Sequence, residues 1–99
     1  MTIERRQEGD SITIILTGKL DIKTSPELRK ELKALPQEFS SLVFDFSKLE
    51  YLTSAGLRVL LEAEQDAEDN DRQMKIIGMN EDIMHIFHIT GFEDLLTIE

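Results

Sequence analysis

A chain of 99 residues with 40% hydrophobic and 31% charged residues is long enough for one packed core, so we expect a single domain across residues 1–99. The absence of cysteine excludes disulfides, thiolate catalysis and cysteine-ligated metals. A net charge of −9 without a cluster of Lys and Arg argues against binding to nucleic acid or an anionic membrane, so we expect a protein partner. The sequence has no signal-peptide pattern and no apolar run long enough to span a membrane, which predicts a cytoplasmic protein.

The first part of the chain predicts a β-hairpin followed by a helix. Residues 3–7 and 11–17 have the pattern of strands, and Gly9-Asp10 between them favours a tight turn. Thr24-Ser25-Pro26-Glu27 is a helix start. Its serine caps the helix ahead of the proline, or its threonine forms a capping box with the glutamate. Leucines on one face continue the helix until Pro36 ends it.

The rest of the chain alternates strands with helices. In chain order we expect a strand over residues 41–46, a helix over 54–69, a strand over 74–79, a helix over 83–90 ended by Gly91 in a left-handed cap, and a short strand over 95–98. The near-continuous apolar run of the first of these strands is typical of a sheet covered on both faces. The order β-β-α-β-α-β-α-β predicts an α/β domain with a mixed, mostly parallel sheet and helices.

The most informative position is Ser54, where a strand and a short polar turn give way to a helix. A helix N-terminus offers unpaired N–H donors and the positive end of the helix dipole, so it favours an anion. Ser54 can cap the helix, which contributes about 1 kcal/mol. Alternatively it can carry a phosphate, to which Arg58 reaches back from the next turn. The residue pattern alone favours the cap, and Thr53 supplies the cap if Ser54 is modified.

Other chemistries lack their motifs. A serine hydrolase elbow needs glycine on both sides of the serine, and Leu52 occupies the first of these positions. Neither a Walker A loop nor a dinucleotide glycine motif is present. Asp45 lacks the acidic pair of a receiver domain and is interpreted as a turn residue that accepts backbone N–H bonds. A metal site at Asp82, His85 and His88 would lack a fourth ligand, so we expect no metal there. Because the motifs above are also missing, we expect no cofactor and no catalytic residue.

Three separated motifs resemble the signature of STAS domains in bacterial anti-sigma factor antagonists. They are Asp45-Phe46-Ser47 with Leu52-Thr53-Ser54-Ala55-Gly56-Leu57, Gly18-Lys19-Leu20-Asp21 after the second strand, and Ile89-Thr90-Gly91-Phe92 at the end of the third helix. The resemblance covers essentially the whole chain in order. It implies the same order of strands and helices that the residue pattern predicts.

The resemblance also implies a phosphorylation switch. Ser54 aligns with the serine that is phosphorylated by an anti-sigma factor, itself an ATP-dependent serine kinase. The unphosphorylated antagonist binds this kinase and frees the sigma factor, and a PP2C-type phosphatase reverses the modification. Thr53 stands where the family usually has aspartate and is the alternative acceptor. The implied partner-binding residues are Asp21, Thr24, Ser25, Thr53, Ser54, Gly56 and Arg58, and the resemblance places Ile22 and Lys23 on the same partner-facing edge.

A second hypothesis belongs to a different class of function. A STAS domain can also be an accessory module of a transporter or of a stress-signalling assembly, where it binds its partner without being phosphorylated. The two hypotheses differ in whether Ser54 gains a phosphate.

Overall fold

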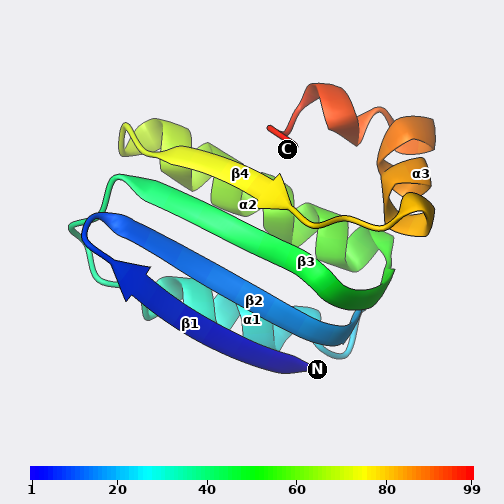
Figure 1. Ribbon diagram of the computed structural model, residues 1–99, viewed down its shortest axis with the longest axis horizontal. Coiled ribbons are helices and arrows are strands. Elements are labelled where there is room, and N and C mark those ends of the chain that lie inside the picture. Colours follow the sequence, from blue (N-terminus) through cyan, green and yellow to red (C-terminus); the bar gives the residue numbers. More distant parts are fainter.

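The computed structural model describes residues 1–99 as a four-stranded sheet with three α-helices (Figure 1). In chain order the elements are β1 (Thr2–Glu8), β2 (Ser11–Leu20), α1 (Ser25–Lys33), β3 (Ser41–Leu52), α2 (Ser54–Asp69), β4 (Gln73–Ile77), α3 (Glu81–Thr90) and the short 3₁₀-helix η1 (Phe92–Asp94). The strand order is β1-β2-β3-β4, with β1 antiparallel to β2 and the other pairs parallel. The predicted α/β class and the mixed, mostly parallel sheet are confirmed.

Helices α1 and α2 both cover the same face of the sheet, behind it in Figure 1. Crossovers between parallel strands are right-handed, and the steps from β2 to β3 and from β3 to β4 go in the same direction across the sheet. Successive right-handed crossovers in one direction place their helices on one side. The prediction that both faces are covered is therefore wrong. On the open face Val43 lies between its register partners Thr13 and Lys75, and only 8% of its surface is exposed.

The core fills the space between this covered face and the helices. Alternate residues of β2 and β3 turn toward α1 and α2, among them Ile12, Ile14 and Leu16 on β2 and Phe44 and Phe46 on β3, all at 0% exposure. The rings of Phe44 and Phe46 meet edge to face with centroids 6.2 Å apart. Burial on this scale makes the sheet a rigid support for the loops at its two ends.

The strand predicted over residues 95–98 is reduced to one bridge, between Ile76 and Ile98. The N–H of Ile76 donates to the carbonyl oxygen of Thr97, and the N–H of Glu99 donates to the carbonyl oxygen of Ile76, each at 2.9 Å. The residues before the bridge do not form a strand. The helix η1 follows α3 directly, and the Leu96 side chain packs into the core at 6% exposure. The predicted left-handed cap is confirmed, since Gly91 has φ 78°.

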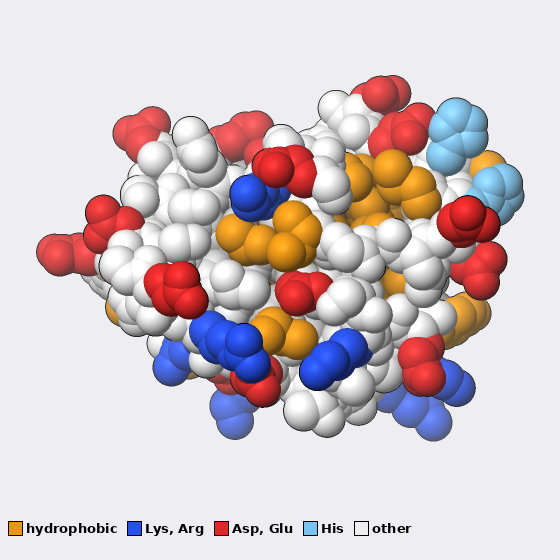
Figure 2. Space-filling view, in the orientation of Figure 1, with side chains coloured by type: hydrophobic (Ala, Val, Ile, Leu, Met, Phe, Trp, Pro, Cys, Tyr) orange, Lys and Arg blue, Asp and Glu red, His pale blue; other side chains and the backbone are white.

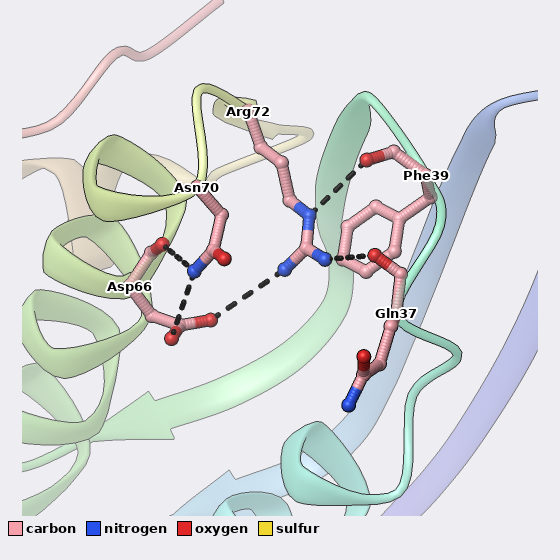
Figure 3. A network of polar contacts seen from close by, with 5 residues as sticks. All are labelled: Gln37, Phe39, Asp66, Asn70 and Arg72. Carbon is pink, nitrogen blue, oxygen red and sulfur yellow. Dashed lines mark hydrogen bonds and ion pairs between the residues drawn. The ribbon is translucent and has the colours of Figure 1, made fainter.

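Arg72 joins two connections at the amino ends of the parallel strands (Figure 3). Its Nε donates to the carbonyl oxygen of Phe39 at 3.1 Å, and a second guanidinium nitrogen donates to that of Gln37. The guanidinium lies 4.0 Å from the centroid of the Phe39 ring and 3.7 Å from the Asp66 carboxylate of α2. The Asn70 side chain donates to the carbonyl oxygen of Asp66 at 2.8 Å. The side chain of Arg72 is only 12% exposed, so its guanidinium is largely shielded from water, although the Asp66 carboxylate beside it is 71% exposed.

We expect Arg72→Ala to lower the free energy of unfolding by about 2 kcal/mol, because it removes two hydrogen bonds, an ion pair and a cation–π contact at a shielded site. The matched control is Arg29→Ala. It breaks the pair between Arg29 and Glu62 at 2.9 Å, where the arginine side chain is 36% exposed, and should cost about 0.5 kcal/mol. Urea unfolding of both variants measures the difference. Equal losses would show that the Arg72 contacts are no stronger than an exposed ion pair.

Candidate functional site

Ser54 is the first residue of α2 and its side chain is exposed. The N-cap position belongs to Thr53, which has an extended backbone (φ −110°, ψ 175°) and makes no capping bond with its side chain. The first backbone bond of the helix runs from the N–H of Leu57 to the carbonyl oxygen of Thr53 at 3.0 Å. The N–H groups before Leu57 have no acceptor within the helix. Ser54 therefore does not cap α2; it presents a free hydroxyl beside unpaired backbone donors.

The neighbouring hydroxyl of Thr53 is hidden. Its Oγ1 is buried and has no hydrogen-bond partner, and the backbone N–H of Thr53 donates to the carbonyl oxygen of Leu20 at 3.1 Å. This backbone bond holds the turn against the end of β2. Two adjacent hydroxyls thus differ in access, with Ser54 facing solvent and Thr53 facing the protein.

Strand β3 brings this turn into place by continuing past residue 46, where we expected it to end. It reaches Leu52 through two register shifts against β2, one after Asp45 and one after Leu49. At the first shift Asp45 Oδ1 accepts the N–H of Ser47 at 2.9 Å, which confirms the predicted bond to a backbone N–H, although Asp45 lies within β3 and not in a turn. The predicted polar turn is therefore bulged strand. The extra residues align Leu52 with Leu20, so that Ser54 follows directly beside the end of β2.

The loop after β2 is built around Asp21. Its Oδ1 accepts the N–H groups of Lys23 at 2.9 Å and Thr24 at 3.1 Å. These bonds hold the pKa of Asp21 below its ordinary value, the Thr24 N–H being the largest cause. The hydroxyl of Thr24 donates to the carbonyl oxygen of Lys19 at 2.8 Å, and that of Ser25 donates to the carbonyl oxygen of Asp21 at 2.5 Å. Neither hydroxyl caps α1 as predicted, because both are bonded backward into this loop.

Gly56 allows the first turn of α2 to approach the sheet closely. A Cβ atom on this residue would lie 2.7 Å from Cγ of Leu20 and 2.7 Å from Cδ1 of Leu52. Gly56 is therefore buried by the same two leucines that end β2 and β3. Its contribution to the site is the position of the helix start.

The residues predicted to contact a partner fall into three groups. Ser54 and Arg58 are exposed, Asp21, Thr24 and Thr53 are half-buried, and Ser25 and Gly56 are buried. Two large hydrophobic side chains are exposed at the same end of the sheet, Ile22 at 77% and Tyr51 at 51%. Sequence reasoning placed Ile22 near the partner-binding residues and missed Tyr51. Tyr51 pairs in register with Lys19 on β2.

The residues weighed for metal binding are not brought together. No group of three His, Asp or Glu side chains lies close enough to hold a metal ion. His88 instead meets Glu93, with Nδ1 and Oε1 at 2.7 Å. None of the helices combines the length and apolar character needed to cross a membrane. A groove of about 640 Å³ runs between α1 and α2 beside Arg72, and none of the predicted site residues lines it.

Comparisons with known proteins agree with this geometry. The chain matches the family described as Mlab, STAS domain, over residues 3–97. It is 30% identical over 99 residues to the anti-sigma-B factor antagonist of Staphylococcus epidermidis, covering 99% of this chain and 92% of that protein. An anti-sigma factor antagonist from Mycobacterium paratuberculosis has the same fold, with TM-score 0.84 and 21% identity over 98% of this chain and 83% of that one. So does the Bacillus cell fate determinant SpoIIAA in its phosphorylated form, with TM-score 0.76 and 14% identity over 99% and 91%.

Proposed function

Since the chain is a STAS domain protein of the bacterial anti-sigma factor antagonist family, we propose that it binds an anti-sigma factor serine kinase in the cytoplasm and thereby releases a sigma factor. Phosphorylation of Ser54 switches the binding off, and a PP2C-type phosphatase restores it. In this role the domain is a regulatory binding protein and not an enzyme.

The observation that carries the proposal is the exposed hydroxyl of Ser54 at the start of α2. A phosphoserine carries about −1.5 to −2 charges at pH 7, and a helix N-terminus stabilises such an anion through its dipole and free N–H groups. Arg58 follows one turn later, is exposed, and takes part in none of the ion pairs within the protein. We therefore expect a phosphate on Ser54 to be accommodated without refolding. The existence of a phosphorylated form of SpoIIAA, another protein of this fold, supports this expectation.

Burial selects between the two candidate acceptors. A kinase must reach the hydroxyl that it modifies, and Oγ1 of Thr53 is buried. Phosphorylating Thr53 would require the turn to leave the end of β2, which its N–H bond to Leu20 opposes. We therefore assign the phosphate to Ser54 alone.

The switch acts through the surface around Ser54. Ile22 and Tyr51 are exposed at the same end of the sheet, so a partner that covers them gains apolar contact area. Once Ser54 carries a phosphate, the same partner must strip water from a dianion. A penalty of about 2.7 kcal/mol is enough to weaken the complex 100-fold.

Incubation with the cognate kinase and ATP tests the proposal. We expect the wild-type protein and Thr53→Val each to gain one phosphate, and Ser54→Ala to gain none, as measured by intact mass. Thr53→Val keeps the side-chain shape and removes only the hydroxyl. A phosphate on Ser54→Ala would move the acceptor to another residue, and an unmodified wild-type protein would reject the phosphorylation switch.

A further inference from the structure

We infer that α3 and η1 form a second protein-binding surface, which takes an amphipathic basic helix of a partner. Five large hydrophobic side chains are exposed in the protein, and three of them lie in these elements or directly after them: Met84 at 39%, Ile89 at 65% and Leu95 at 57%. Single exposed hydrophobic residues are ordinary on a protein surface, whereas several in one short segment indicate an interaction site. We call the exposed side chains of α3 and η1, with Leu95, the α3 surface.

Helix α3 has one face in the core and one face without a partner in the domain. Ile83 and Phe87 are 1% and 0% exposed and anchor the helix. Met84, His88 and Ile89 are exposed. Met84 and His88 are one turn apart, and Ile89 lies about 100° further around the helix axis than His88, so the three side chains are spread over the outer side of α3. Methionine adapts its shape to different apolar partners, which suits a docking surface.

The charged side chains of the α3 surface are all acidic. The chain has no Lys or Arg after Lys75, and Glu81, Asp82, Glu93 and Asp94 belong to α3 and η1. Figure 2 shows the consequence at the upper right, where hydrophobic, acidic and histidine side chains lie over α3 and η1 without a blue side chain among them. Only Glu93 is paired, with His88; the other three carboxylates make no ion pair in the protein. A partner with Lys or Arg beside its apolar residues complements this surface in both respects.

No other surface of the molecule combines the two features. The second half of α2 is acidic, but none of the exposed large hydrophobic residues belongs to it, and its Glu62 and Asp66 are paired with arginines. The Ser54 end has exposed hydrophobic residues, but there Ile22 is followed by Lys23 and Tyr51 pairs with Lys19. Exposed apolar area and a purely acidic surround coincide only on the α3 surface.

A synthetic amphipathic helix made of Leu and Lys is a suitable probe. We expect its amide-shift map on the isotope-labelled protein to centre on α3 and η1, and its affinity, from fluorescence anisotropy, to fall about tenfold in the double variant Ile89→Asn/Leu95→Asn. The same peptide with Glu in place of Lys should not bind. Far-UV circular dichroism checks that the double variant is folded.

Two control variants distinguish specific docking on the α3 surface from nonspecific hydrophobic or electrostatic binding elsewhere on the protein. Ile22→Asn removes the most exposed hydrophobic side chain, and Glu68→Gln/Asp69→Asn removes acidic charge from α2; each should change the affinity by less than about twofold. A tenfold loss in either control, a shift map centred elsewhere, or no binding at millimolar protein would overturn the inference. The experiment uses neither kinase nor phosphate, so its result does not depend on the proposed function.

Discussion

Ser54→Asp is expected to weaken binding to the anti-sigma factor kinase at least 100-fold, which corresponds to about 2.7 kcal/mol. The substitution places a permanent carboxylate where the exposed hydroxyl stands, at the end of the sheet where Ile22 and Tyr51 are also exposed. A partner that covers this surface must desolvate that charge. Titration calorimetry with the purified kinase measures the loss.

Two further measurements separate charge from simple damage. Ser54→Ala keeps the surface uncharged and should bind within about threefold of the wild-type protein, because the hydroxyl makes no hydrogen bond that shapes the site. Ser54→Asp should also be at least as stable as the wild-type protein, since an acidic residue in the first turn of a helix stabilises it by about 0.3–1 kcal/mol. Equal binding by Ser54→Asp would contradict the charge mechanism, and a matching loss in Ser54→Ala would make the hydroxyl itself the contact.

Gly56→Ala should lower the free energy of unfolding by up to about 2 kcal/mol although alanine is the better helix former. The helical preference for alanine over glycine is about 1 kcal/mol, and overpacking a tight contact costs about 1–3 kcal/mol. Cδ1 of Leu52 is a chain end that can turn aside, but Cγ of Leu20 is a branch point in a side chain with 0% exposure. Relief therefore requires α2 to move away from β2, and Ser54 moves with it.

Urea unfolding of Gly56→Ala alongside Ala55→Gly tests this contact. Ala55→Gly reports the helical preference of the same turn without any new atom, and should cost no more than about 1 kcal/mol. If Gly56→Ala proved more stable than the wild-type protein, the close approach of α2 to Leu20 and Leu52 would be wrong.

The sequence predicted the elements that have a regular period, and it failed where the period breaks. Helices α2 and α3 follow the 3.6-residue spacing, and their predicted bounds agree closely with the structure. The end of β3 was missed because each of its two register shifts adds a residue and reverses which side chains face the core. The open face of the sheet was missed because it depends on the strand order, which hydrophobic spacing does not contain.

The candidate site was predicted as a region more accurately than as a set of contacts. Pattern and resemblance located the connection at Ser54. Which of the Thr53 and Ser54 hydroxyls is exposed depends on the residue at which α2 starts, and the sequence does not define that start to a single residue. The same holds at α1, where the hydroxyls of Thr24 and Ser25 have alternative acceptors in the Asp21 loop. Such competition between local hydrogen bonds is decided only in three dimensions.

The position of the Arg72 contacts bears on how proteins of this kind diverge. They join the connections at the amino ends of the parallel strands, whereas Ser54 and the Asp21 loop lie at the carboxyl ends. Under the proposed function we therefore expect substitutions at Ile22 or Tyr51 to alter partner choice with little effect on folding, because exposed positions far from the core contribute little to stability. After gene duplication, two copies can therefore come to bind different partners while both keep the Arg72 contacts. Two related signalling pathways in one cell could then operate without binding each other's partners.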